Sequence, residues 1–233
     1  IIPYRGSWLE FEIDQKKELI YAKIDRKKKI LGTIFLRALG YSTREEIINC
    51  FYVTEDVKIP SDLEKRDELA GRVLGKPVII KDEETGEEKK LFRAGDKLHP
   101  HDIDDLVANG IKEINVIKFN MKKRPDDKEE KNPSLDSEMI VNCFEREEIV
   151  FSKEGSSTAD EPTKEECLSK VYAVLMPGEP ITVEAAERDL TTMFFSVRRY
   201  DLGRVGRYKL NKKFDYKEPV EDVTLTKEDI INT

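Results

Sequence analysis

The sequence predicts an α+β fold, in which a mostly helical body with a β-hairpin is interrupted by a small β-rich inserted domain. Apolar residues recur at helical spacing toward both ends of the chain, whereas the middle contains short apolar runs between tight turns. The length of 233 residues suffices for one large domain or two modest ones. We therefore predict a discontinuous body of residues 1–53 and 162–233 and an inserted domain of residues 54–161.

The first elements are a β-hairpin and two helices. Residues 8–13 and 19–24 mix apolar and polar side chains on either side of a polar turn, which is typical of paired strands. Residues 30–39 carry apolar side chains every three or four positions and are followed by a glycine, as at many helix C-termini. Thr43 and Glu46 have the spacing of a capping box, which predicts that a second helix begins there.

The inserted domain is predicted to begin at a boundary over residues 53–66, where the chain becomes polar. Residues 72–95 favour short strands around turns, residues 101–109 a short helix, and residues 114–117 a strand. The polar segments predicted to be mobile loops are residues 122–137 and 152–161.

Helical patterns return after the inserted domain. Thr163 and Glu166 form another capping-box pattern ahead of an apolar stripe, and Thr182 begins the next helix. The chain starts at Ile1 instead of Met and stops at Thr233 just as a further helix begins, so we expect a piece of a longer polypeptide.

The charge of the chain is unevenly distributed. The 41 basic and 48 acidic residues give a net charge of −7, which by itself argues against nucleic acid. Residues 21–29, however, contain five basic residues and one acidic residue, and residues 198–213 contain seven and one, so the remainder carries −17. Because a phosphate responds to charge within about a Debye length, these two basic segments predict local electropositive surfaces.

Other chemistry is sparse in the sequence. The three cysteines form no CxxC pair, which argues against a disulfide framework or a zinc ribbon and favours a reducing, intracellular setting. His99 and His101 resemble half a metal site and are predicted to serve a cap or loop, while Cys167 lies on an apolar stripe and is predicted to be core. No glycine-rich phosphate loop, catalytic carboxylate pair or membrane-spanning run of ~20 apolar residues is present.

Six blocks of sequence carry a resemblance to a known family. They include the stretch around Gly6-Ser-Trp8, Ile24-Asp-Arg-Lys-Lys-Lys29 with its following helix, Met176-Pro-Gly-Glu-Pro180, Phe194-Phe195, Arg199-Tyr-Asp-Leu202 and Val205-Gly-Arg-Tyr-Lys-Leu-Asn211. In this order they resemble the lobe region of the β subunit of bacterial DNA-directed RNA polymerase. The middle of the chain resembles the lineage-variable insertion of that lobe more weakly, through residues 91–96 and 103–117.

The resemblance implies a place in a large assembly. The lobe would form a wall of the downstream DNA cleft and contact the downstream duplex and the non-template strand. Its partners would be the remainder of β and the β′, α and σ subunits, in the bacterial cytoplasm, with no membrane involved. The catalytic Mg²⁺ would be held by aspartates of β′, so this chain would carry no cofactor or catalytic residue of its own, and the isolated piece would be a monomer.

Trp8 has two interpretations. A lone tryptophan is often a core anchor, here for the hairpin. The alternative is a stacking platform for an unpaired base. The resemblance implies that the tryptophan of the Gly-Ser-Trp motif contacts a base of the non-template strand, and on that implication we favour stacking.

The basic segments suit sequence-independent contact with phosphates, since lysine is a point charge on a flexible stem. The alternative is a solvated charged face. Tyr200, Tyr208 and Phe214 alternate with the second basic segment, as in single-strand binding surfaces. Asp25 is predicted to pair with a neighbouring Arg or Lys, and the resemblance also places it near DNA. The predicted DNA-contacting residues are Trp8, Asp25, Arg26, Lys27, Lys28, Lys29, Arg204, Arg207 and Lys209.

We expect Trp8, Lys27, Lys28, Arg204 and Arg207 to line one exposed surface, because two basic segments on an acidic body suggest joint action. A rival interpretation is a protein-interaction module. The acidic insertion would then dock a transcription factor, and the basic segments would pair with acidic segments of β′ or σ. The two interpretations differ in salt dependence, which is steep for phosphate neutralisation.

Overall fold

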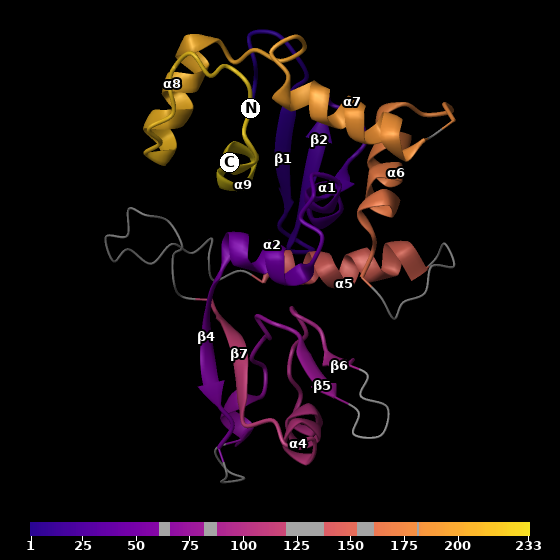
Figure 1. Cartoon of the computed structure of the whole chain (residues 1–233), viewed down its shortest axis with the longest axis vertical. Coiled ribbons are helices and arrows are strands. Elements are labelled where there is room, and N and C mark those ends of the chain that lie inside the picture. The colour runs from indigo at the N-terminus through magenta and orange to yellow at the C-terminus, as the bar shows by residue number, and fades with distance from the viewer. Residues whose placement is uncertain (61–65, 82–87, 120–137, 153–160, 181) are drawn as a thin grey trace. The chain divides into compact units, whose positions relative to one another are not determined.

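The computed structural model describes residues 1–60, 66–81, 88–119, 138–152, 161–180 and 182–233. The chain divides into unit 1, residues 1–42 and 145–233, and unit 2, residues 43–144. Helices and small antiparallel sheets occur together, which confirms the predicted α+β class (Figure 1). In the part of the chain that the structure describes, no helix is long and apolar enough to cross a bilayer.

The sheet of unit 1 contains the predicted hairpin. Strand β1 (Leu9–Asp14) pairs antiparallel with β2 (Leu19–Ile24), so that Leu9 lies opposite Ile24. A short strand β3 (Ile30–Leu31) adds to the other side of β2, giving the order β1-β2-β3. The hairpin is therefore confirmed, and the helix expected from residue 30 begins two residues later because its first residues pair with β2.

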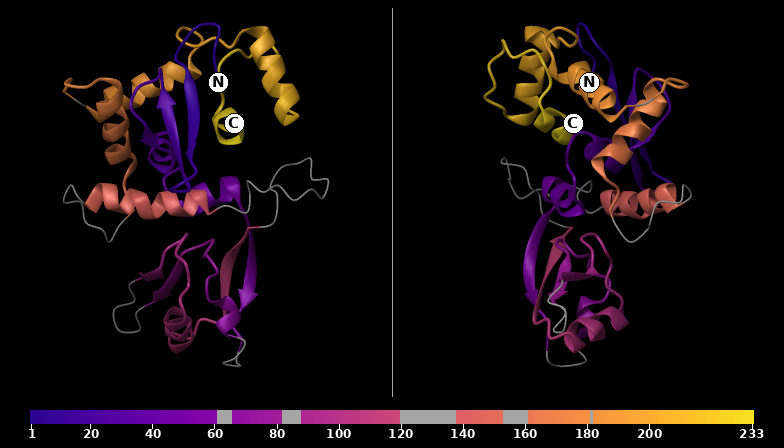
Figure 2. Two further views of the ribbon diagram at one scale, coloured as in Figure 1. Left: turned by 180° about the vertical axis from the view of Figure 1, so that it is seen from behind. Right: turned by 45° about the vertical axis from the view of Figure 1, so that its right-hand side comes forward.

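Helix α1 packs on this sheet, α6 packs on α1, and α7 packs on α6 (Figure 2). An aromatic core lies among these elements. Phe35 lies 6.3 Å from Phe11 and 6.4 Å from Phe194, and Phe194 lies 6.0 Å from Tyr200, all as ring centroids. Thr163 and Thr182 cap their helices as predicted. The helices are α1 (Gly32–Ala38), α6 (Lys164–Leu175), α7 (Val183–Phe195), α8 (Gly203–Phe214) and α9 (Lys227–Asn232).

Unit 2 has its own apolar core, centred on Leu74, Leu98, Leu106 and Val116. Thr43 caps the first helix with the predicted capping box. The elements are α2 (Arg44–Phe51), β4 (Val53–Lys58), a 3₁₀ turn (Asp67–Leu69), β5 (Val78–Lys81), β6 (Glu88–Phe92), α4 (Pro100–Ala108) and β7 (Glu113–Lys118). Strand β4 pairs with β7, and β5 pairs with β6, both antiparallel.

Two features of the sequence prediction differ from the structure. The polar stretch from residue 53 begins with strand β4 and not with a linker, because it pairs along its whole length with β7. Helix α5 (Met139–Ser152) was not predicted, although Ile140, Val141 and Phe144 have helical spacing and are buried. The predicted loop over 122–137 lies outside the described residues, as does most of the one over 152–161.

A buried arginine of unit 1 contacts residues near both boundaries with unit 2. Arg37 is fully buried, and its Nε donates to both carboxylate oxygens of Glu147 at 3.0 and 3.2 Å. Its Nη1 donates to the carbonyl of Ser42 and to Glu161 at 3.3 Å. Ser42, Glu147 and Glu161 all belong to unit 1, whereas α2 belongs to unit 2, and the division between the units falls at residues 42/43 and 144/145.

This arrangement predicts how the chain can be shortened. Ser42 and Glu147 both contact the Arg37 guanidinium, so a short glycine-rich linker can replace residues 43–144. The shortened chain is expected to keep a cooperative thermal transition in far-UV circular dichroism. Deleting residues 56–160 removes Glu147 and leaves the buried Arg37 guanidinium with Glu161 as its remaining carboxylate, and losing one partner of a buried pair costs about 3–5 kcal/mol. Loss of the cooperative thermal transition in the first deletion would contradict this division. Equal stability of the two shortened chains would contradict it as well.

Candidate nucleic-acid interface

The candidate interface begins at Trp8, just before β1. Hydrogen bonds to Asp25, in the turn after β2, hold the backbone of Trp8 in place. The Trp8 N–H donates to Oδ1 of Asp25 at 2.7 Å, and the Asp25 N–H donates back to the Trp8 carbonyl at 3.0 Å. Asp25 has φ +50°, a left-handed conformation that a short, locally hydrogen-bonded Asp side chain tolerates. The prediction that Asp25 pairs with a neighbouring cation is wrong: its carboxylate holds the Trp8 backbone.

The Trp8 ring is half-buried and contacts Arg26. The guanidinium carbon of Arg26 lies 4.8 Å from the ring centroid, which is cation–π geometry, and Arg26 itself is exposed. Trp8 is therefore not a fully buried core anchor. The turn presents an aromatic ring and a guanidinium together at the surface of unit 1.

The three lysines after Arg26 have different surroundings. Lys27 donates its Nζ to the carbonyl of Leu175, the last residue of α6, and so satisfies a helix C-terminus. Lys29 pairs with Glu12, which also binds Lys23 at 2.5 Å. Lys28 is exposed and has no ion-pair partner among the described residues.

The Glu12 pairing shifts both partners toward their charged forms. Hydrogen bonds from Lys23 and Lys29 lower the pKa of Glu12, and the bond to Glu12 raises the pKa of Lys29. Glu12 therefore offsets part of the charge of the first basic segment. Arg26 and Lys28 remain the cations of this segment that an anionic ligand can reach without displacing a protein partner.

In the second basic segment too, some cations are paired within the protein and others are exposed without an ion-pair partner. Arg204 pairs with Glu221 at 2.6 Å, and this bond lowers the pKa of the Glu221 carboxyl. Lys213 lies 4.7 Å from the ring centroid of Phe214. The exposed cations of this segment without an ion-pair partner among the described residues are Arg198, Arg199, Lys209, Lys212 and Lys213.

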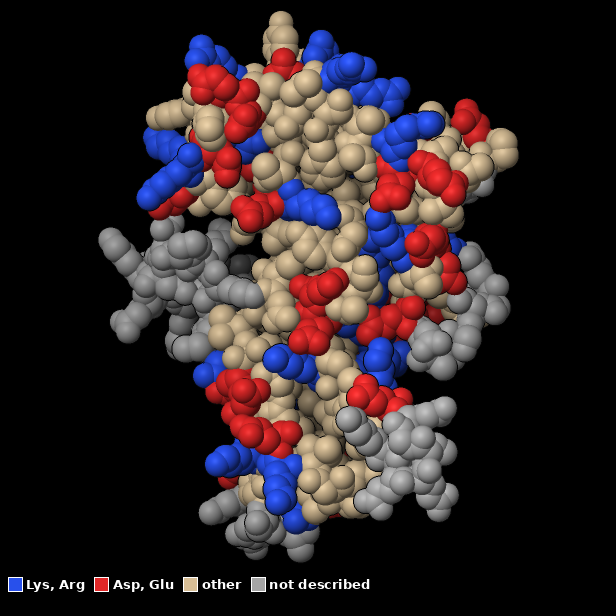
Figure 3. Space-filling model, viewed as in Figure 1, with Lys and Arg blue, Asp and Glu red and all other residues tan. Residues whose placement is uncertain are grey.

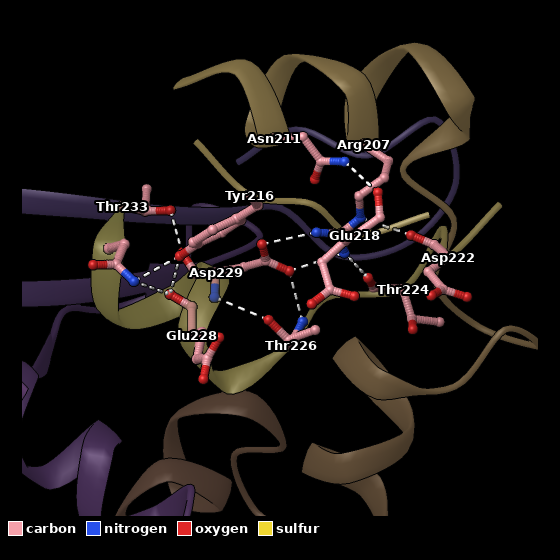
Figure 4. A network of polar contacts seen from close by, with 11 residues as sticks. Arg207, Asn211, Tyr216, Glu218, Asp222, Thr224, Thr226, Glu228, Asp229 and Thr233 are labelled. Atoms are coloured by element: carbon pink, nitrogen blue, oxygen red, sulfur yellow. Dashed lines mark hydrogen bonds and ion pairs between the residues drawn. The ribbon is translucent and has the colours of Figure 1, made fainter. Parts of the chain in front are cut away.

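Arg207 contradicts the prediction that it lines an exposed surface. It is 0% exposed, and its guanidinium forms a bidentate pair with Asp229 at 2.8 and 2.9 Å (Figure 4). Its Nε donates to the carbonyl of Asp222 at 2.7 Å, and Nη2 donates to that of Thr224. Arg207 therefore ties α8 to the C-terminal segment and has no donor directed to solvent.

The aromatic residues of the second segment also differ from the expectation. Tyr200 is fully buried in the aromatic core, and this burial raises the pKa of its hydroxyl. Phe214 is half-buried, and Tyr208 is 57% exposed. Tyr208 is thus the aromatic side chain of the three that lies open beside Lys209 and Lys212 on α8.

Residues 5–6 connect the two basic segments in space. The backbones of Arg5 and Asp201 exchange hydrogen bonds of 3.0 and 2.8 Å, and Arg5 Nη2 donates to the Val197 carbonyl at 3.0 Å. Trp8 is three residues further, at most about 11 Å along the chain. The loop that carries Arg198 and Arg199 is therefore near the Trp8 turn. The sequence prediction expected the second basic segment near Trp8 but named Arg204 and Arg207 for this surface.

Gly6 makes this close approach possible. It has φ +128°, and a Cβ there would lie 2.8 Å from the Arg199 carbonyl oxygen and 2.9 Å from the Tyr200 ring. Any other residue would separate the N-terminal segment from the loop. The Gly-Ser-Trp stretch thus combines a packing requirement at Gly6 with an accessible ring at Trp8.

Acidic side chains are interspersed with the basic ones on the visible surface of unit 1 (Figure 3). The positive charge open to a ligand is therefore smaller than the sequence count suggests. The described residues contain no group of three His, Cys, Asp or Glu side chains that could hold a metal ion. The predicted cap role of His99 is confirmed, since its N–H donates to Asp102 at 2.7 Å at the start of α4.

The sequence of both units matches a known family. Residues 1–82 and 140–232 match the family described as RNA polymerase Rpb2, domain 2. The chain belongs to this family. The match omits residues 83–139 of unit 2, so this Rpb2 domain 2 chain departs from the family pattern within the inserted unit.

Relatives extend this result over the whole chain. The Rpb2 domain 2 chain is 57% identical to the DNA-directed RNA polymerase subunit beta of Treponema denticola and 54% identical to that of Treponema pallidum, over 233 residues in each case. It is 50% identical over 234 residues to the same subunit of Borreliella burgdorferi. The chain spans 19% of the length of each relative. The resemblance to the polymerase β subunit is therefore confirmed.

Proposed function

We propose that this chain forms a DNA-contacting wall of a bacterial DNA-directed RNA polymerase, in which it contacts the downstream duplex and the non-template strand. The observation that carries the proposal is the Trp8 turn, where a half-exposed ring, Arg26 and Lys28 lie together without acidic partners. An aromatic face stacks on a base of any sequence, and neighbouring cations attract its phosphates. Both properties suit an enzyme that translocates along any sequence.

Under this proposal the residues bind and orient DNA and take no part in bond formation. Arg26 and Lys28 neutralise phosphates, and Asp25 keeps the Trp8 backbone in place. We assign phosphate contacts also to Arg198 and Arg199, in the loop near the Trp8 turn, and to the exposed Lys209 on α8. The catalytic Mg²⁺ is assigned to the β′ partner, and the remainder of β, α and σ complete the enzyme in the cytoplasm.

The first test removes the ring. Trp8→Ala in the full-length β subunit, assembled into polymerase, is expected to destabilise the promoter complex by about 1–3 kcal/mol, measured as a shorter complex lifetime. Trp8→Phe retains an aromatic face and is expected to recover part of the lifetime. The melting temperature of the 233-residue chain should change little, since the ring is half-exposed; a strongly destabilised chain would assign Trp8 to packing instead.

The same assembly separates DNA contact from the rival protein-docking role. Lys28→Ala is expected to reduce the slope of log affinity against log salt by about 0.9, the value for one lost phosphate contact. Lys112→Ala, an exposed lysine of unit 2, is the matched control and should leave the slope unchanged. An unaltered slope in Lys28→Ala, together with weaker binding of a protein factor, would support the protein-interaction module.

A further inference from the structure

Unit 1 contains a pocket that the DNA-contacting role does not use. Its volume is ≈ 220 Å³, and it lies between β2, the start of α1, α5 and α6. The buried side chains of Ile30, Leu31 and Ile34 form its floor, and the half-buried Val150 and Val174 line its sides. The pocket is therefore apolar inside and open to solvent.

Cations surround this apolar interior. Lys29, Arg146 and Lys170 line the pocket, and none of the described residues that line it is acidic. This is unusual in a chain whose net charge is −7. Helices α5 and α6 contribute to the pocket in the same way. On α5 Arg146 lies four residues before Val150, and on α6 Lys170 lies four residues before Val174, so the cation and the valine share one face of each helix.

The three cations are not equivalent. Lys29 already pairs with Glu12, and Lys170 lies 5.5 Å from the ring centroid of Phe151. Arg146 is exposed on α5. Arg146 is therefore the cation of the three on which the attraction toward an anion at the pocket rests, and its guanidinium can bind a carboxylate in bidentate fashion.

We propose that this pocket docks an acidic segment of a protein partner, which inserts one large apolar side chain between flanking carboxylates. The volume is below the ~300–1,000 Å³ typical of sites for drug-sized ligands and cofactors, so it suits a single side chain. Burying such a side chain against the apolar floor is favourable because it removes apolar surface from water, and the cations bind the carboxylates beside it. Duplex DNA offers phosphates without an apolar group to fill the floor, so the observations favour a peptide.

The test uses a synthetic fluorescent peptide, acetyl-Glu-Asp-Phe-Glu-Asp-amide, and the 233-residue chain, with its fold checked by circular dichroism. Fluorescence anisotropy measures binding, and methyl NMR locates it. The peptide is expected to shift the methyl signals of Val150, Val174 and Ile34. Its affinity should fall about fivefold or more in Arg146→Glu, as expected when a surface ion pair becomes a repulsion. Lys112→Glu makes the same charge change in unit 2 and should leave the affinity unchanged.

A second peptide and a DNA probe separate the alternatives. The peptide with Ala in place of Phe should bind at least fivefold more weakly, since its apolar contact is lost. Equal binding of the two peptides, equal losses in Arg146→Glu and Lys112→Glu, or no binding at millimolar peptide would each overturn the proposal. Stronger shifts of the same methyl groups by a DNA duplex would also overturn it and make the pocket a phosphate site. None of these variants touches Trp8, Arg26 or Lys28, so failure here leaves the DNA-contacting proposal standing.

Discussion

Asp229→Ala is expected to lower the free energy of unfolding of the 233-residue chain by about 3–5 kcal/mol, because it leaves the buried Arg207 guanidinium without its counter-charge. The same carboxylate accepts the Thr226 N–H at 2.7 Å at the start of α9, so one of the two hydrogen bonds of this capping box is lost as well. Chemical denaturation monitored by circular dichroism measures the loss.

A matched control and a double variant make this expectation specific. Glu221→Ala breaks the exposed pair with Arg204 and should cost at most about 1 kcal/mol. Replacing Arg207 by Met and Asp229 by Leu together removes both charges and should recover much of the stability lost in Asp229→Ala. A loss below about 1 kcal/mol in Asp229→Ala would show that this pair does not hold α8 to the C-terminal segment.

Phe194→Ala is expected to destabilise the chain by about 3–5 kcal/mol, the usual cost of truncating a fully buried phenylalanine. The Phe194 ring contacts those of Phe35, Phe195 and Tyr200, so its loss leaves a cavity between α1, α7 and the loop at Tyr200. That loop carries Arg198 and Arg199, and the promoter complex should therefore also become shorter-lived in polymerase that contains the variant.

Phe195→Ala is the control for this prediction. Phe195 is the next residue of the same helix, but its side chain is half-buried, so the change is expected to cost less than half as much. The two variants are compared by thermal unfolding under identical conditions. Similar losses for both would mean that helix propensity, and not the buried aromatic core, accounts for the effect.

Local signals in the sequence located most elements correctly. The capping boxes at Thr43 and Thr163 are sufficient to place α2 and α6, because the cap satisfies backbone N–H groups within four residues of itself. The hairpin of β1 and β2 is equally local, since its strands are joined by a short turn. Helix α5 was not predicted, although its apolar residues have helical spacing, and it lies between two polar segments of the sequence.

The sequence also predicted which residue types make up the candidate site. It did not predict which of their charged groups are exposed to a ligand. Arg207 and Lys28 both belong to basic segments, and no sequence signal separates them. Arg207 meets Asp229, 22 positions along the chain, in a fully buried pair, whereas Lys28 meets solvent. A guanidinium loses its water only where folding supplies a carboxylate and carbonyls in its place.

The sequence by itself determined the family, the fold class and the elements whose hydrogen bonds close within a few residues. The tertiary structure decided which side chains face a ligand, because burial and pairing depend on residues far apart in the chain. Arg37 shows this most directly: its partners Ser42, Glu147 and Glu161 all belong to unit 1 but lie on opposite sides of unit 2 in the sequence. A buried guanidinium needs its carboxylate and carbonyl partners together, and only the folded chain brings these distant residues to one place.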